Sequence, residues 1–274
     1  MLPVDLISQA TSDGKVTNLP WSQGRSQITD VIGRAFCGTA TTPAEAALHW
    51  SLGPELTTPD DPERNDVGRF CMEMGLCTRG PLSTTLAARD GAGNIAAVAV
   101  VQKLGCAPPE STCMDAIRII ATVVPMVLSG KMPKALQSDP GVQRRGSLLT
   151  PAFARLHETH ADFPHIYLVM IGTDPPHQGK GHGAALLRAV NCIADVAGVP
   201  VYLETGPANR SLYEHFGFAV VGETTICEKT DEGEVEGATP SPVAEGMNNQ
   251  AAGATMSSWS PLCPYLAMVR QPSR

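Results

Sequence analysis

The sequence has no closely paired cysteines, no long apolar run and no excess of basic residues. Its eight cysteines include no C-x-x-C pair, and His157-x-x-His160 has neither a cysteine nor a second histidine pair beside it. A structural zinc site usually takes four Cys or His ligands at such spacings. We therefore expect no metal, and we interpret the cysteines as buried thiols that act as small apolar side chains.

Membranes and nucleic acids are excluded on similar grounds. The most apolar stretch, residues 117–128, contains Arg118 and Pro125 and is too short to span a bilayer. The first 15 residues lack a basic segment followed by a long apolar one, so no secretory signal is expected. The formal charge is −7, and no basic face indicates a nucleic-acid partner. We expect a cytoplasmic protein.

Length and composition indicate an α/β protein. The chain has 274 residues, 43% of them hydrophobic, with 26 glycines and 23 prolines, which suits one domain with long loops. Residues 1–25 show no clear period and are expected to fray, whereas 26–274 are expected to form a single domain. Residues 228–258 carry −5 of the net charge, with many Gly, Pro and Ser and no period. They predict a disordered acidic insert within a hairpin.

Hydrophobic periodicity predicts the elements. A helix is expected over 27–47, and a second begins near 60–62. Strands at 83–89 and 95–102 form a hairpin, and 113–160 is helical with breaks at Pro125, Pro133 and Pro140. The remaining elements are strand 165–173, helix 181–197, strand 201–204, helix 209–215 ending at Gly217, and antiparallel strands 218–227 and 262–270.

The segment Gln178-Gly179-Lys180-Gly181-His182-Gly183 lies between an apolar strand and an amphipathic helix. Glycines let backbone N–H groups approach a ligand without an obstructing side chain. The first N–H groups of a helix lack backbone acceptors and carry the positive end of the helix dipole. A strand, a glycine-rich turn and a helix start in this order predict a phosphate cradle.

Two kinds of phosphate-containing ligand fit this segment, and a third interpretation is a glycine-rich connection that binds no ligand. Gly179-x-Gly181-x-x-Ala184 matches a dinucleotide fingerprint, with Glu204 about 20 residues further on. In that fold the first glycine directly follows the strand, whereas residues 174–178 intervene here. The pattern Gln/Arg-x-x-Gly-x-Gly/Ala of acyl-CoA-dependent N-acyltransferases fits residues 178–183 without departure, so we favour acyl-CoA.

Residues from about 160 to 223 resemble the GNAT superfamily of N-acetyltransferases, in particular the branch that includes puromycin N-acetyltransferase. The matching segments are Pro164 to Leu168, Ile171-Gly172-Thr173-Asp174-Pro175, Gln178 to Gly183, Gly198 to Thr205, and Asn209 to Phe218. The branch commonly has Trp where Ile166 stands and Pro where Ala161 stands. The resemblance implies the GNAT fold, a mixed central sheet flanked by helices, and acetyl-CoA as co-substrate.

The resemblance also implies roles for individual residues. Tyr213 would protonate the departing thiolate. From its own position, on the strand face of Tyr202 and at a strand end beside the acceptor site, we expect Glu204 to remove the amine proton, directly or through water. Cofactor contacts are implied for Ile171, Gly172, Thr173, Gln178, Gly179, Lys180, Gly181, His182, Gly183 and Asn209. His160 and His165 are weaker candidates for the base.

Each of these residues has a structural alternative. Gly172 suits a bulge or a close ligand approach, but it equally suits close packing. Asn209 is a good helix N-cap, Tyr213 a core tyrosine, and Glu204 a member of a salt bridge. We interpret the chain as an N-acetyltransferase acting on a primary amine of a small molecule; the alternatives are a protein N-acetyltransferase or a non-catalytic acyl-CoA-binding module.

Overall fold

The computed structural model describes residues 2, 4–11, 14–40, 44–56, 58, 61–79, 83–104, 117, 120–121, 124–125, 128, 130, 132–228 and 260–273. The expected acidic insert lies outside these residues except for Glu228.

A seven-stranded mixed sheet forms the centre of the molecule. Its strand order is β1-β2-β3-β4-β5-β7-β6, and every neighbouring pair is antiparallel except β4 with β5. The strands are β1 (Val16–Asn18), β2 (Thr84–Arg89), β3 (Ile95–Leu104), β4 (His165–Thr173), β5 (Val201–Thr205), β6 (Ala219–Cys227) and β7 (Leu262–Arg270).

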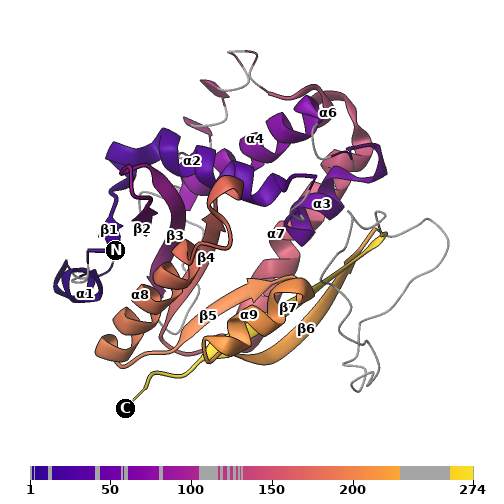
Figure 1. Ribbon diagram of the computed structural model, residues 1–274. Coiled ribbons are helices and arrows are strands. Elements are labelled where there is room, and N and C mark those ends of the chain that lie inside the picture. Colours follow the sequence, from indigo (N-terminus) through magenta and orange to yellow (C-terminus); the bar gives the residue numbers. More distant parts are fainter. Residues whose placement is uncertain are drawn as a thin grey trace.

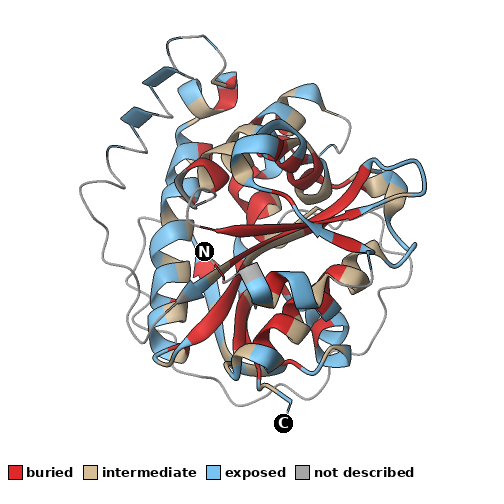
Figure 2. Ribbon diagram, turned by 90° about the vertical axis from the view of Figure 1, so that its left-hand side faces the viewer, coloured by how far each residue is buried: buried red, intermediate tan, exposed pale blue. Residues whose placement is uncertain are grey.

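Helices cover both faces of this sheet, which confirms the α/β class (Figure 1). One face packs against α1 (Val4–Ala10), α8 (His182–Ala197) and α9 (Arg210–His215). The other packs against α2 (Trp21–Cys37) and α4 (Pro62–Arg79) over β2–β4, and against α3 (Ala46–Leu52) and α7 (Pro140–His160) over β5–β7. Figure 2 shows the buried strands passing between helices whose outer sides are exposed. The remaining elements are α6 (Lys134–Ser138) and the 3-10 turns η1 (Pro54–Leu56), η3 (Pro175–His177) and η4 (Pro207–Asn209).

The apolar run in β3 has a direct structural reason. Residues 96–101 are fully buried, because α8 covers one side of the strand and α2 the other. A strand covered on both faces gains from apolar residues at every position rather than at alternate ones. The hairpin of β2 and β3 and the antiparallel pairing of β6 with β7 are confirmed.

Two expectations for the N-terminal third are wrong. The helix expected over 27–47 is two helices: α2 begins at Trp21 and ends before Gly38, whose φ of +71° is left-handed, and α3 follows from Ala46. Residues 1–25 were expected to fray, yet they contain α1 and β1, with Leu2, Ile7 and Val16 buried in the core. Both elements are too short to show a period, and tertiary burial holds them in place.

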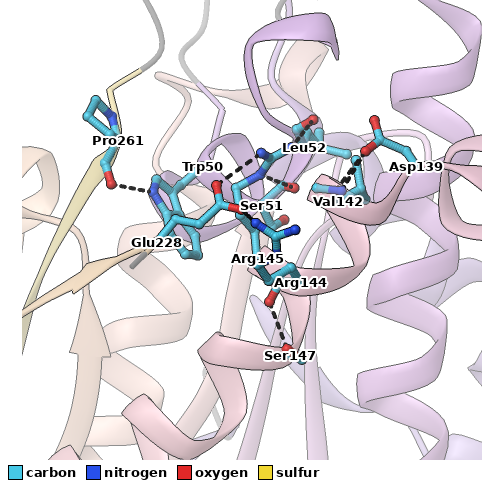
Figure 3. A network of polar contacts seen from close by, with 11 residues as sticks. Trp50, Ser51, Leu52, Asp139, Val142, Arg144, Arg145, Ser147, Glu228 and Pro261 are labelled. Carbon is cyan, nitrogen blue, oxygen red and sulfur yellow. Dashed lines mark hydrogen bonds and ion pairs between the residues drawn. The ribbon is translucent and has the colours of Figure 1, made fainter. Parts of the chain in front are cut away.

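A buried arginine joins three elements far apart in the sequence (Figure 3). Arg145 of α7 donates to the carbonyl oxygens of Ser51 and Leu52 at the end of α3, at 3.2 and 3.5 Å. It also donates to Glu228, just beyond β6, at 3.4 Å, and Arg144 donates to the same carboxylate at 3.2 Å. This network fixes α3 and α7 against the outer strands.

Candidate active site

The parallel strands β4 and β5 separate after a short stretch of pairing. Only Ile166 with Val201 and Tyr167 with Tyr202 are in register. Beyond these pairs β5 continues to pair with β7, while β4 pairs with β3 alone among the strands that the structure describes. Figure 1 shows β4 running toward α2 while β5 turns away toward β7. The β5-facing edge of β4 from residue 168 onward therefore offers backbone groups to an extended ligand.

A β-bulge lies in β4 at the start of this free edge. Val100 pairs with Met170 and Val101 with Leu168, so Val169 has no partner of its own in the register. Gly172, where the sequence suggested a bulge or a ligand, is instead closely packed. A Cβ at Gly172 would lie 2.8 Å from the Cβ of Ala35 in α2, so the close approach is to a helix.

The glycine-rich segment forms a turn that leads into α8. Gly179 has φ +72° and Gly181 has φ +86°, and α8 begins at His182. A Cβ at either glycine would meet nothing within 4 Å, so the space in front of the turn is open. Counting along the described backbone from Gly179, the N–H of Ala185 is the first that donates to a backbone carbonyl, that of Gly181 at 3.0 Å. The geometry fits an anion such as a pyrophosphate.

The side chains of this turn mostly brace it. The Gln178 amide donates to the Thr173 carbonyl at 3.1 Å, and the Lys180 ammonium to the Pro176 carbonyl at 2.8 Å. The His182 ring lies 5.9 Å from that of His177. Because Gln178 and Lys180 already have partners, the backbone N–H groups are the stronger candidates for holding a phosphate.

An ion pair anchors the start of the turn to α2. The Arg34 guanidinium donates twice to the Asp174 carboxylate, each time at 2.8 Å. The Asp174 side chain is 11% exposed, and its backbone N–H donates to the Ala96 carbonyl. A bidentate pair of this kind fixes orientation as well as distance, so α2 and β3 both set the position of the cradle.

Tyr213 lies in the core at the base of α9. Burial raises the pKa of its hydroxyl above the usual value, the nearby charge of Glu45 raises it further, and hydrogen bonding to Thr205 lowers it. The Asn209 amide donates to the Thr205 hydroxyl at 3.2 Å and makes no side-chain cap for α9. Asn209 thus occupies the N-cap position of α9 without capping the helix through its side chain, and Thr205 connects Asn209 with Tyr213.

Glu204 lies two residues beyond the last β4–β5 pair, on the face covered by α7. Its side chain is only 6% exposed, and its Oε1 lies 3.6 Å from Nδ1 of His157. Within the described part of the chain, this oxygen has no hydrogen-bond partner. The neighbouring Tyr202 hydroxyl has a raised pKa because it is buried and then because Glu204 is negatively charged.

Of the two histidines considered as bases, His165 is fully buried. Its Nδ1 lies 2.6 Å from the Phe163 carbonyl and its Nε2 lies 3.1 Å from Nε2 of His157. The ring of His160 packs onto Gly222 of β6. Ile166, where the branch commonly has Trp, faces α8 in the core, on the opposite face from Glu204.

Sequence reasoning missed four residues around the site: Arg34, Glu45, His157 and Thr205. The carboxylate of Glu45 accepts a hydrogen bond from Tyr265 of β7 and caps α3 through the Leu48 N–H at 2.9 Å. Only Thr205 had a local signal, because it follows Glu204 at the end of a predicted strand. The other three are brought to the site by long-range packing.

Two general features of the described residues bear on the site. They contain no group of three or more His, Cys, Asp or Glu side chains arranged to hold a metal ion. None of the helices in this part of the chain is both long enough and apolar enough to cross a membrane.

Part of the chain is similar to a known protein family. Residues 143–220 match the family described as the acetyltransferase (GNAT) domain, a segment that includes β4, the cradle, α8, β5 and α9. An uncharacterised N-acetyltransferase of Schizosaccharomyces pombe is 45% identical over 53 residues, 19% of this chain and 22% of the relative. The chain therefore matches about a fifth of the length of that curated relative.

The fold is similar to that of a solved N-acetyltransferase. The arylalkylamine N-acetyltransferase 2 of Aedes aegypti has a TM-score of 0.50 and 14% identity, covering 94% of this chain and 98% of its own. A Corynebacterium glutamicum structure, described as histone acetyltransferase HPA2 and related acetyltransferase, has a TM-score of 0.48 and 19% identity, covering 95% and 97%. The chain has the GNAT fold, and its residues 143–220 match the acetyltransferase (GNAT) domain.

Proposed function

We propose that this chain is an N-acetyltransferase that moves the acetyl group of acetyl-CoA to a primary amine of a small molecule. The observation that carries the proposal is the free edge of β4, which is followed, after the short turn η3, by a glycine-rich helix start. An extended, peptide-like pantetheine chain suits a strand edge, and a pyrophosphate suits open backbone N–H groups with a helix dipole behind them.

The cofactor contacts expected from the sequence divide into two groups in this proposal. The backbone of Ile171, Gly172 and Thr173 would pair with pantetheine, and an N–H near Ile171 would polarise the carbonyl. The N–H groups of residues 179–183 would hold the pyrophosphate. Asn209 would act through Thr205 as well as through any direct contact.

Acetyl-CoA supplies an activated acetyl thioester, and the chain supplies the proton chemistry. Tyr213 would donate a proton to the departing sulfur. Burial keeps this hydroxyl protonated at neutral pH, and the Thr205 hydrogen bond orients it. Glu204 would take the proton from the acceptor ammonium, since only the neutral amine has a lone pair for attack.

The resemblance to the puromycin N-acetyltransferase branch favours a small-molecule amine. A protein N-terminus is the alternative acceptor, and a non-catalytic acyl-CoA-binding module is the alternative from another class. All three share the cradle, so a binding measurement alone does not separate them.

The test has two stages. Thermal unfolding is first measured with acetyl-CoA, longer acyl-CoAs and NAD(P); stabilisation by NAD(P) but not by CoA compounds would contradict the cofactor assignment. Thiol release is then measured with acetyl-CoA and a panel of aryl amines, alkyl amines, diamines and amino-terminal peptides. Turnover only with peptides would favour the protein acceptor, and binding without any turnover would favour the non-catalytic module.

A further inference from the structure

Three side chains lie in a row that runs inward from Glu204, and their contacts determine where the protons are. The three residues are Glu204 of β5, His157 in the last turn of α7, and His165 at the start of β4. They lie on the sheet face opposite α8, with the His157 ring packed against Tyr167 and Tyr202 at centroid distances of 4.7 and 4.6 Å. These contacts hold the imidazole in one orientation.

The positions of the ring protons can be assigned one residue at a time, beginning with the innermost residue, His165. The Phe163 carbonyl can only accept, so Nδ1 of His165 carries a hydrogen and donates it at 2.6 Å. Burial lowers the pKa of His165, which keeps this ring neutral. Its Nε2 is then an acceptor, and the atom 3.1 Å away, Nε2 of His157, must be the donor. The remaining nitrogen, Nδ1 of His157, faces Glu204 at 3.6 Å.

When His157 is neutral, the lone pair of Nδ1 and the Glu204 carboxylate face each other with no proton between them. When one proton is added, the two become an imidazolium–carboxylate ion pair. Glu204 Oε1, buried and without a hydrogen bond among the described residues, is the atom that gains this partner. The Glu204–His157 pair can therefore accept one proton between Oε1 and Nδ1, close to the point where β4 and β5 separate.

We propose that Glu204 and His157 together receive the proton of the acceptor ammonium, with His165 as the positioning residue that fixes the tautomer of His157. This inference rests on the proposed function and adds the destination of the proton. The N–H bond of the ammonium breaks, the Glu204 carboxylate accepts the proton, and an N–H bond forms at Nδ1 of His157. No electron transfer or co-reactant is involved, and the proton leaves to solvent after turnover.

Other ionisable groups surround the pair. Tyr167 and Tyr202 contact the His157 ring from β4 and β5, and Tyr265 of β7, paired with Glu45, interacts electrostatically with Glu204. The pKa values of Tyr202 and Tyr265 are raised, first by burial, so both stay neutral in the working pH range. On α7 itself Glu158 is exposed, and His160 is directed to Gly222.

The first measurement does not depend on activity. In ¹⁵N-histidine-labelled protein, we expect the Nδ1–H tautomer for His165 and the Nε2–H tautomer for neutral His157. An Nδ1–H tautomer for neutral His157 would overturn the proposal.

The second measurement uses the amine and acetyl-CoA that support turnover in the parent protein, so failure of the proposed function would be seen first. His157→Phe keeps a ring between Tyr167 and Tyr202 but removes both nitrogens. We expect kcat/KM to fall by about 10²-fold or more, with loss of the acidic limb of the pH profile and unchanged acetyl-CoA affinity. Glu158→Gln, one residue away and exposed, is the matched control and should retain parent activity.

A merely structural role for His157 predicts a different result. Its packing would be preserved in His157→Phe, so activity and pH profile would match the parent, and the proposal would be wrong. The same conclusion would follow if His160→Phe, and not His157→Phe, removed the acidic limb, because the base would then lie one turn away on α7.

Discussion

At the residue scale, Tyr213 combines a core position with a directed hydroxyl. Tyr213→Phe keeps the packing against Phe218, whose ring centroid lies 5.7 Å away, and removes only the hydroxyl. We expect turnover to fall by about 10²–10⁴-fold, typical of a lost general acid, with acetyl-CoA affinity nearly unchanged. Single-turnover kinetics and acetyl-CoA titration would measure the two effects separately. A loss of less than about threefold would assign Tyr213 to core packing alone.

His165 couples stability to pH. Burial lowers its pKa in the folded protein, and unfolding returns it to about 6.5. As pH falls through this value, the unfolded chain takes up a proton that the folded chain does not, so the free energy of unfolding decreases. Above that pH the residue adds no pH dependence.

The prediction is tested with His165→Gln in urea unfolding between pH 7.5 and 5. The parent should lose stability more steeply than the variant on the acidic side of this range, whatever their difference at pH 7.5. Parallel profiles would show that His165 is protonated equally in both states.

At the element scale, the turn before α8 is defined by backbone conformation. Gly181 has φ +86°, and a β-branched residue there is strained as well as obstructing. Gly181→Val should abolish acetyl-CoA binding in a calorimetric titration while the protein remains folded.

Gly93 in the β2–β3 hairpin provides a matched control for Gly181. It has the same φ of +86° and equally open surroundings, but it lies in another turn. Gly93→Val should therefore cost similar stability, about 1–3 kcal/mol, and leave acetyl-CoA affinity intact. If Gly181→Val bound acetyl-CoA normally, the turn would not be the phosphate cradle.

The junction of α3, α7 and β6 depends on Arg145 more than on its neighbour Arg144. The Arg145 side chain is 6% exposed and bonded to two carbonyls and Glu228, whereas that of Arg144 is 61% exposed. Arg145→Met should lower the free energy of unfolding by about 3–5 kcal/mol, because it leaves the buried Ser51 and Leu52 carbonyls without this donor and removes one of the two guanidinium partners of Glu228. Arg144→Met should cost about 1 kcal/mol or less. Equal effects in denaturant unfolding would contradict this division of roles.

At the scale of the whole molecule, ligand binding is linked to folding. The proposed acetyl-CoA site draws on β4, the turn and α8, so acetyl-CoA would bind the folded chain only. We expect stabilisation of about 2.7 kcal/mol at a hundredfold excess over the dissociation constant. Melting temperature should rise with the logarithm of acetyl-CoA concentration in the parent and stay constant in Gly181→Val. A rise in both would place the ligand elsewhere.

The sequence alone determined the elements and the turn of the C-terminal half. Strands 165–173 and 262–270, the helix start after Gly181 and the helix end at Gly217 are where periodicity and glycine placed them. These are local properties, because a run of apolar residues, a cap or a required φ is decided within a few positions along the chain.

Only the tertiary structure decided which side chains meet. Arg34 and Asp174 are 140 positions apart, and His157 and Glu204 are 47 apart; neither pair has a local signal. Gly172 proved to pack against α2, and the bulge fell at Val169, because both depend on the surface of a partner helix or strand. Likewise α1 and β1 exist because the core buries their few apolar residues. The sequence could predict a cradle and its two catalytic candidates, but the proton path that we propose behind Glu204 required the three-dimensional contacts, since hydrogen-bond direction is fixed by atoms that only folding brings together.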